Sequence, residues 1–466
     1  MAHAYSAIGT CPFNECAVFV LDGCGSPLDH FLQLHPEERQ LISSKSLSSL
    51  EMQCEQDSFY YYDGQNLKTL HKTFSPLSNP DHTISLPTTR HSIGGFYAVV
   101  SKYVFGNMDD VGKLMGLSPY GQRGTFNWSA FHIDSEGSLF VLDDWKEAFT
   151  KPFISYENFS NNFQYYANVA RWAQDEIEKA VIQILRARID KFPSSNLCYA
   201  GGVALNAVAN SKILNSGIVD ELYIEPASAD NGLALGCAYY GWLEVLKKRR
   251  APHDGNTCFG KVYSHEAIME STKQLPNASV SYLTYPTEEE LTKEVSAFLN
   301  KGLTVAWFQQ GSEFGPRALG RRSILAHPGF PGLKDHINKN IKFREDFRPF
   351  APAIIDEDVN KYFESSRDSP YMILINKTKK SYLEDLTNVT HIDGTARVQT
   401  VVKKWNRRFY QLLRAFEKQS GFPILLNTSF NKKGTPIVET PQEAIELFIE
   451  TALDVLVIEN LVILKR

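Results

Sequence analysis

Apolar positions along the chain fall into short continuous runs and into longer repeats with helical spacing. A continuous run bounded by glycine or polar residues is typical of a buried strand, and such runs cover residues 16–21, 303–308 and 422–431. Apolar residues three or four positions apart predict helices over residues 161–190 and 404–419. Both halves of the chain are therefore expected to contain strands as well as helices.

The apolar pattern weakens in two places. Residues 26–56 are polar, with many serines and leucines, and predict either a helical excursion or a mobile insertion. Residues 256–285 continue a basic and then turn-rich stretch, which is typical of a linker. Because 466 residues exceed one ordinary core, several domains are expected. We therefore predict domains over 1–255 and 286–466, joined by a linker over 256–285.

Composition and charge exclude some classes of protein. The net charge is −5, from 48 basic and 53 acidic residues, so nothing draws the whole chain toward nucleic acid, and any anion site must be local. The sequence has no run of 18 apolar residues and no apolar leader, so neither a membrane span nor a signal peptide is expected. The seven cysteines are scattered without a CxxC pair, which favours reduced thiols in a cytoplasmic protein. The oligomeric state is left open, with a homo-oligomer as one option.

The stretch from Gly311 to Pro352 concentrates cations beside turn-forming and aromatic residues. A solvated charge run usually mixes signs and lacks aromatics, whereas rigid packing around repeated arginines points the cations in fixed directions. Guanidinium groups pair bidentately with phosphate or carboxylate, and a lysine adds a point charge. We therefore favour a partly buried anion site, with a phosphate ester as ligand, over a surface basic patch. Among the cations of this stretch are Arg317, Arg321, Arg322, Lys342, Arg344 and Arg348.

Glycine turns follow two of the predicted strands in the first half. The strand over 16–21 ends in Asp22-Gly23, a turn that brings backbone close to phosphates and a carboxylate close to a nucleotide-bound metal. A second strand ends in Gly201-Gly202 and opens a helix, which presents backbone N–H groups to a nucleotide. Asp230 precedes another helix, and residue chemistry alone favours an N-cap there over a ligand.

Longer motifs make the chain resemble the O-carbamoyltransferases that modify nodulation factors, cephamycins and aminoglycosides. The motifs run in order over nearly the whole chain. The strongest are Gly315-Pro-Arg-Ala-Leu-Gly320, Arg344-Glu-x-x-Arg-Pro-Phe-Ala-Pro352, His391-x-Asp-Gly-Thr-Ala-Arg397 and Asn427-Thr-Ser-Phe-Asn431. Earlier segments that agree are Asp22-Gly23, Lys113-Leu-Met-Gly-Leu-Ser-Pro-Tyr-Gly121, Gly201-Gly-Val-Ala-Leu-Asn206 and Asp230-Asn-Gly232.

The resemblance implies a fold and a two-step reaction. The fold is mixed α/β: a partial ATPase domain of the actin and sugar-kinase class, which is Kae1-like, followed by a YrdC-like α/β domain. The YrdC-like domain would convert carbamoyl phosphate and ATP into carbamoyl-adenylate. The Kae1-like domain would transfer the carbamoyl group to a hydroxyl of a natural-product or glycan-like small molecule. A divalent metal, with iron favoured over magnesium, would take part.

The same resemblance assigns roles to individual residues. Cations would hold phosphate and carbamate oxygens and offset developing negative charge, while amide and hydroxyl groups supply directional hydrogen bonds. The residues implied in catalysis are Arg317, Lys342, Arg348, Arg397 and Asn427. Carbamoyl phosphate and adenylate binding adds Arg344 and Ser429. The nucleotide-binding residues are Asp22, Gly23, Gly201, Gly202 and Asn206. The metal ligands are His3, Asp22 and Asp230. For Asp230, the resemblance therefore implies a metal ligand in place of an N-cap.

The chain departs from the family at its start. The family begins with a subdomain of about 100 residues that carries a His-x-x-x-His metal pair. His3 matches the second histidine of that pair, so we expect the chain to begin within the motif, without the first lobe of the ATPase fold. This leaves a second hypothesis, a truncated and non-catalytic nucleotide-binding paralogue or subunit. A third, a relative that acts on tRNA, is disfavoured by the acidic charge balance.

Overall fold

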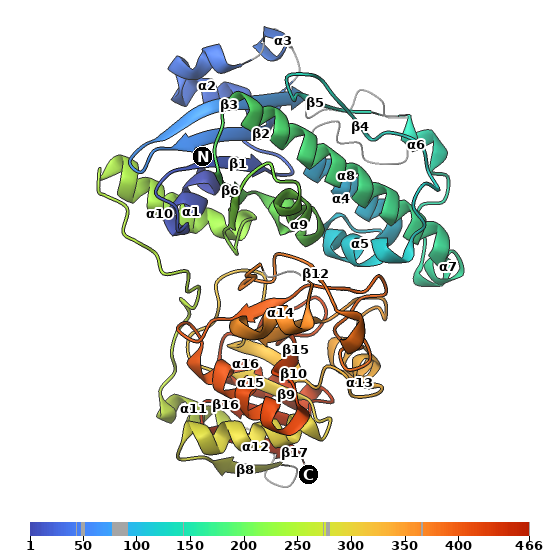
Figure 1. Cartoon of the computed structure of the whole chain (residues 1–466), viewed down its shortest axis with the longest axis vertical. Coiled ribbons are helices and arrows are strands. Elements are labelled where there is room, and N and C mark those ends of the chain that lie inside the picture. The colour runs from blue at the N-terminus through green and yellow to red at the C-terminus, as the bar shows by residue number, and fades with distance from the viewer. Residues whose placement is uncertain are drawn as a thin grey trace. The chain divides into compact units, whose positions relative to one another are not determined.

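The described residues form two compact units, Met1–Gly255 and Asn256–Arg466 (Figure 1). Both units combine helices with β-sheets, so the prediction of a mixed α/β fold is confirmed. No helix among the described residues is long and apolar enough to span a membrane. The computed structural model describes residues 1–42, 44–47, 52–76, 92–142, 144–273, 275, 280–364 and 367–465.

The first unit is built on a five-stranded sheet. Its central strand, β1, pairs in parallel with β6 and antiparallel with β2, and β6 pairs in parallel with β7. All six residues of β1 are buried, as expected for an interior strand covered on both faces, and its bounds agree with the strand predicted over 16–21. In spatial order the strands are β3 (Leu67–Pro76), β2 (Gln53–Tyr62), β1 (Cys16–Leu21), β6 (Asn196–Ala200) and β7 (Glu221–Ile224).

Helices pack around this sheet. The longest, α8, confirms the helix predicted over 161–190, and it lies beside α4 (Figure 1). Helix α1 packs on α10, so the first residues of the chain are part of the core. The helices of this unit are α1 (Ala2–Thr10), α2 (Leu28–Leu34), α3 (Ser44–Leu47), α4 (Ile93–Phe105), α5 (Val111–Leu117), α6 (Trp145–Ala148), α7 (Tyr156–Asn161), α8 (Phe163–Lys191), α9 (Ala207–Asn215) and α10 (Leu233–Tyr240), and β4 (Phe131–Ile133) pairs with β5 (Leu139–Val141).

The polar segment 26–56 is helical in its described part. Helices α2 and α3 enclose a small apolar cluster of Leu28, Phe31 and Ile42, with Phe74 of β3. The helical alternative is therefore confirmed for this part of the segment, although β2 already begins at Gln53. Leu28, with the partly buried Leu32 and Leu47, belongs to this cluster, whereas Leu34 is exposed.

The second unit is built on an eight-stranded sheet. Parallel pairs join β11 with β14 and β9 with β16, and the other neighbours are antiparallel. In spatial order the strands are β14 (Gln399–Val401), β11 (Ala351–Ile355), β15 (Ile424–Ser429), β10 (Arg322–Ala326), β9 (Val305–Phe308), β16 (Val455–Ile458), β17 (Leu461–Lys465) and β8 (Val280–Thr284).

Alternate residues of this sheet serve two cores. On β9, Val305 and Trp307 belong to the cluster under α12 and α15, whereas Ala306 and Phe308 belong to the cluster that includes α16. This follows from the two-residue period of a strand. Figure 1 shows α12 and α15 side by side, and α15 confirms the helix predicted over 404–419. The helices are α11 (His265–Thr272), α12 (Glu288–Asn300), α13 (Leu333–His336), α14 (Val359–Tyr362), α15 (Arg407–Ser420) and α16 (Pro441–Glu450), and β12 (Asn376–Lys377) pairs with β13 (Thr395–Ala396).

The linker predicted over 256–285 is wrong. Helix α11 and strand β8 lie within it, and β8 forms the outer edge of the eight-stranded sheet by pairing with β17. Ile268 of α11 and Val280 of β8 are buried in the core. The helix and the edge strand were missed because both are too short to show a clear apolar period and because the segment is rich in turn-forming residues.

Candidate functional site

The loop before β10 carries Arg317 and is fixed by a buried carboxylate. Glu313 accepts hydrogen bonds from the backbone N–H of Leu319 and of Arg321, both at 2.6 Å. Gly315 and Gly320 take positive φ values of 131° and 98°, which side chains rarely adopt. Glu313 was missed from the sequence, where an acidic residue next to an arginine-rich stretch gave no sign that it organises the loop.

Two arginines of the second unit have no counter-ion in the described chain. No hydrogen bond or ion pair from another described residue reaches the side chain of Arg317 or Arg397, and the Nε atom of each is buried. Burial, together with the charge of Arg348, lowers the pKa of Arg317 to about 10. Burial, and then the charges of Arg317, Arg344 and Arg348, lowers the pKa of Arg397. Arg317 and Arg397 are half-buried, and like charges brought together in this way favour the binding of an anion that offsets them.

Two more arginines complete this group. Arg344 donates from Nε to Asn338 Oδ1 at 2.8 Å, and its guanidinium lies 4.3 Å from the ring centroid of Phe350. Burial and the charge of Arg348 lower the pKa of Arg344 to about 9. Arg348 lies 3.9 Å from Glu345, whose carboxylate also pairs with a lysine. We call Arg317, Arg344, Arg348 and Arg397 the arginine cluster.

Lys342 belongs to the same region but its donors are used within the chain. Its Nζ donates to the backbone oxygens of Ser429 and Asn431, both at 2.7 Å, and to Asn431 Oδ1 at 2.6 Å. Burial, and then the charges of Arg344 and Arg348, lowers the pKa of Lys342. The structure thus brings the predicted residues Lys342 and Ser429 together, and Lys342 ties the π-helical turn Ile337–Lys342 to the end of β15.

Asn427 joins β15 to the arginine loop. Its Nδ2 donates to Gln399 Oε1 at 2.7 Å and to the backbone oxygen of Ala318 at 3.2 Å. Its Oδ1 is buried and accepts no hydrogen bond from the described residues. Gln399 also donates to the backbone oxygen of Leu319, so it fixes both the amide and the loop. Sequence reasoning missed Gln399, although it lies two residues after Arg397.

The remaining arginines of the stretch are structural. Arg321 donates to the backbone oxygen of Trp405 at 2.8 Å. Arg322 is fully buried, lies 3.5 Å from the ring centroid of Phe308 and donates to the backbone oxygen of Gln309. These two cations stabilise the fold around β10, and the anion site that the sequence predicted is narrowed to the arginine cluster and Lys342.

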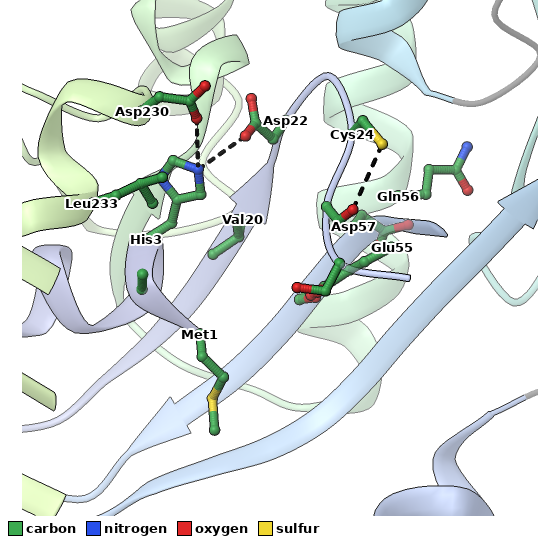
Figure 2. Close-up of a pocket in the computed structure, with 14 residues that line it drawn as sticks. Met1, His3, Val20, Asp22, Cys24, Glu55, Gln56, Asp57, Asp230 and Leu233 are labelled. Carbon is green, nitrogen blue, oxygen red and sulfur yellow. Dashed lines mark hydrogen bonds and ion pairs between the residues drawn. The ribbon is translucent and has the colours of Figure 1, made fainter. Parts of the chain in front are cut away.

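A second group of predicted residues meets at one edge of the sheet in the first unit. Asp22 follows β1, Gly201 and Gly202 follow β6, and Asp230 lies beyond β7. These three strands are parallel, so their carboxyl ends lie at the same edge, where ligands of open α/β sheets bind. A pocket of about 320 Å³ opens there (Figure 2). His3, Asp22, Cys24, Glu55, Asp57 and Asp230 are among the residues that line it.

His3 lies between two carboxylates in this pocket. Its Nε2 is 2.9 Å from Asp22 Oδ2 and 3.7 Å from Asp230 Oδ1 (Figure 2). Asp22 Oδ1 accepts hydrogen bonds from the backbone N–H of Gly23 at 2.8 Å and of Gly202 at 3.0 Å. Burial alone would raise the pKa of Asp22, but the hydrogen bond and charge of His3, with these two amides, hold it below its ordinary value.

These three side chains fit a divalent metal ion. One imidazole nitrogen and two carboxylate oxygens lie within 4.8 Å of one another. This mixed nitrogen and oxygen donor set suits a first-row transition ion such as iron and is also compatible with magnesium. Asp230 is not an N-cap, because its side chain caps no helix and is 83% exposed, so the preference drawn from residue chemistry alone is wrong.

The glycine turn beside this pocket is closely packed. Gly201 has φ 92°, and a Cβ atom there would lie 2.0 Å from the backbone oxygen of Leu21. Its N–H donates to the backbone oxygen of Ser228, so this amide is used within the chain, as those of Gly23 and Gly202 are. Asn206 caps α9, and its Nδ2 donates to Gln174 at 3.0 Å. Asn206 therefore holds the helix that follows the turn.

Several acidic residues of this region were missed from the sequence. Glu55 and Asp57 line the pocket from β2, and each pairs with a buried cation: Glu55 with Lys72 at 2.5 Å, and Asp57 with Arg188 at 3.3 Å. Glu225 directly follows β7 and is buried, and its Oε2 accepts no hydrogen bond from the described residues. Burial raises the pKa of Glu225 to about 7. The sequence positions of Glu55 and Asp57 give no sign of which cation each will meet, because Lys72 and Arg188 lie far away along the chain.

Comparison with known proteins identifies a family for both halves of the chain. The family model "Carbamoyltransferase N-terminus" matches residues 1–239, and "Carbamoyltransferase C-terminus" matches residues 296–465. Nodulation protein NolO of Bradyrhizobium diazoefficiens is 35% identical over 397 residues, which are 84% of this chain and 70% of that protein. Uncharacterized protein sll1178 of Synechocystis is 32% identical over 506 residues, with 100% of this chain and 75% of that protein covered.

A third relative and one solved structure complete the comparison. Nodulation protein NolNO of Sinorhizobium fredii is 34% identical over 382 residues, which are 80% of this chain and 56% of that protein. A crystal structure of full-length HypF in its phosphate- and nucleotide-bound form matches 40% of this chain and 22% of that chain, at 17% identity and a TM-score of 0.25, too low to bear on the fold. The two family models and the long relatives show that the chain belongs to the carbamoyltransferase family.

Proposed function

We propose that the chain is an ATP-dependent O-carbamoyltransferase. Its second unit would form carbamoyl-adenylate from carbamoyl phosphate and ATP, and its first unit would transfer the carbamoyl group to a hydroxyl of a small-molecule acceptor. The observation that carries the proposal is the pair of half-buried guanidinium groups, Arg317 and Arg397, whose Nε atoms are buried and which have no counter-ion in the described chain. A phosphate group is the ligand that such paired forks suit best.

The residues of the second unit divide the work of binding and activation. Arg317 and Arg397 would bind phosphoryl oxygens bidentately and offset the charge that develops in two stages. Water would first release inorganic phosphate from carbamoyl phosphate and leave carbamate, and a carbamate oxygen would then bond to the α-phosphorus of ATP as pyrophosphate leaves. Arg344, stacked on Phe350, has a fixed orientation from which to support them. Lys342 holds β15 in place and adds positive charge.

Asn427 would orient the carbamoyl group. Its Nδ2 is used by Gln399, which leaves Oδ1 as a buried acceptor without a donor among the described residues. The NH₂ of a carbamoyl group is a donor of matching kind, and a buried acceptor that gains a partner recovers the cost of its desolvation. This hydrogen bond would distinguish a carbamoyl group from an acetyl group, which has no N–H.

The first unit would complete the transfer at its acidic pocket. His3, Asp22 and Asp230 would hold the metal, which when bound polarises a carbonyl oxygen or lowers the pKa of a bound hydroxyl. Asp22 is fixed by two backbone amides and is kept ionised, so it stays a ligand at neutral pH. The Gly201-Gly202 turn would let the nucleotide approach the backbone at the same strand edge.

Exchange of labelled pyrophosphate into ATP tests the first step. We expect the full chain to catalyse this exchange only when carbamoyl phosphate is present, since the adenylate must form reversibly before pyrophosphate can return. A folded protein that binds ATP and carbamoyl phosphate but gives no exchange would refute the proposed reaction. If exchange is observed, a panel of hydroxyl compounds tests the second step. A carbamoylated product, identified by mass spectrometry, would establish the acceptor class.

A further inference from the structure

Three cysteines that are scattered in the sequence meet inside the first unit. Cys11 follows the last residue of α1, Cys16 begins β1 and Cys198 lies in β6. All three are buried, with 2% exposure at Cys11 and none at the other two. The sulfur atoms lie within 4.8 Å of one another, and those of Cys16 and Cys198 are 3.5 Å apart. The cluster is separate from the pocket that contains His3 and Asp22.

The spacing of these sulfurs suits a metal ion. Thiolates bind zinc at about 2.3 Å, so three sulfurs around one ion of that size lie about 4 Å from one another. The Cys16–Cys198 separation of 3.5 Å is slightly shorter than this value and no pair exceeds 4.8 Å, so small rotations of the side chains would bring all three sulfurs to the required spacing. No further histidine, cysteine or carboxylate among the described residues joins the group, so the donor set is three sulfurs.

Arg250 supplies the charge that such a site needs. Its NH1 lies 3.1 Å from Cys11 Sγ and donates to the backbone oxygens of Ile8 and Cys11, both at 2.8 Å. Its guanidinium also lies over the ring of Tyr62, 5.4 Å from the centroid. Three thiolates around a divalent ion leave one negative charge, which one guanidinium cancels. A cation beside a thiol also favours the thiolate form.

We propose that Cys11, Cys16 and Cys198 bind one soft, thiophilic metal ion in a buried all-sulfur site, with Arg250 as its counter-charge. Each thiol that is protonated beforehand releases its proton when its sulfur bonds to the ion, and no electron is transferred. Soft thiolate ligands select soft ions over magnesium or calcium. An ion that is stable with three sulfur ligands fits this site better than an ion that needs four protein ligands.

The site would stabilise the elements that form the acidic pocket. Helix α1 carries His3, Asp22 directly follows β1 and Gly201 directly follows β6, and the three cysteines lie on or next to these same elements. An ion bound to all three sulfurs would join the helix to both strands. Since folding brings the three sulfurs together, the ion should bind the folded state more tightly than the unfolded chain and so raise the melting temperature of the protein.

Cadmium is the probe for the first experiment. We expect reduced full-length protein to bind one equivalent of Cd²⁺ and to show a sulfur-to-metal charge-transfer band. Displacement of Cd²⁺ by Zn²⁺ or Cu⁺, followed through the loss of this band, will rank the ions by affinity. Cys16→Ala and Cys198→Ala should each weaken binding by about 100-fold or more, because a lost ligand costs more than a lost outer partner. Cys237→Ser, an exposed cysteine on α10, and His3→Ala should both leave the band unchanged.

Alkylation of the unmodified protein gives a readout that does not depend on variants that fold. With Cd²⁺ bound, mass spectrometry after partial denaturation should show Cys11, Cys16 and Cys198 protected and Cys237 modified. The proposal is overturned if no one-to-one band forms, if the band survives Cys16→Ala or if it disappears with His3→Ala. It is also overturned if Cys16 and Cys198 are found as a disulfide and the reduced protein binds no metal.

Discussion

The two candidate sites have opposite charge. In the second unit, four arginines and Lys342 come together, and Glu345, which pairs with Arg348, is shared with another lysine. In the first unit, Asp22 and Asp230 meet at a single imidazole, with further carboxylates along the pocket wall. One site therefore requires an anion and the other a cation. This difference supports a division of work in which the second unit binds the phosphate substrates and the first unit holds a metal.

The sites also differ in how their charges are positioned. Around the arginine cluster, side chains do the positioning: Glu313 fixes the loop, Asn338 fixes Arg344 and Gln399 fixes Asn427. Around the acidic pocket the backbone does so, through the amides of Gly23 and Gly202 and the tight turn at Gly201. Substitutions at the acidic pocket should therefore act mainly by destabilising the fold. Substitutions at the arginine cluster should act mainly by removing charge from the anion site.

The largest effect is expected at Gly201. Replacement by alanine places Cβ 2.0 Å from a backbone oxygen at φ 92°, and we expect a loss of about 3–5 kcal/mol in the free energy of unfolding. Gly217→Ala is the control, since its φ is also positive, at 67°, but nothing lies within 4 Å, and it should cost about 1 kcal/mol. Urea denaturation measures both. Equal losses would show that the turn does not depend on close packing.

Next in size is the loss of Arg317. Arg317→Ala removes a charge-assisted contact worth about 1.5–3 kcal/mol, so we expect carbamoyl phosphate-dependent pyrophosphate exchange to fall by about 10- to 100-fold. The free energy of unfolding should not fall, because this arginine bonds to no described residue. Arg407→Ala, whose side chain is 71% exposed, is the matched control. Exchange rates that agree between the two variants would exclude Arg317 from the anion site.

A smaller effect is expected at Glu225. Burial raises the pKa of this carboxyl from 4.5 in its ordinary state to about 7, so the folded protein binds a proton that the unfolded chain releases. Stability from this group is therefore present below pH 4.5 and is lost as the pH rises to about 7. Glu225→Gln should raise the free energy of unfolding by about 2 kcal/mol at pH 8 and change it little at pH 4. An equal change in the free energy of unfolding at both pH values would contradict the raised pKa of Glu225.

Much of the fold could be predicted from apolar periodicity. The strand at Cys16–Leu21 and the long helix α8 were predicted because burial on both faces, or along one helical stripe, leaves a clear pattern. The edge strand β8 and the short helix α11 were missed because each has few buried residues. A turn-rich composition masked them.

Prediction of the sites was uneven for a related reason. Arg317 and Arg397 could be identified from motifs. Only the structure shows that they differ from Arg322, which lies in the same arginine-rich stretch as Arg317 but stacks on Phe308 inside the protein. Gln399 and Glu313 act through hydrogen bonds to residues far away or to backbone, which no local pattern records. The three-cysteine cluster depends on strand pairing between β1 and β6, so its spacing along the chain carries no signal.

The division of work between the two sites is tested most directly by a crossed pair of variants. Arg317→Ala and Asp230→Ala would be compared in full-length protein for pyrophosphate exchange and for bound iron, measured by elemental analysis. Arg317→Ala should lower the exchange rate by about 10- to 100-fold and keep its metal, whereas Asp230→Ala should lose metal and keep exchange at the wild-type rate. Loss of exchange in Asp230→Ala, or loss of metal in Arg317→Ala, would contradict the assignment of the two steps to the two units.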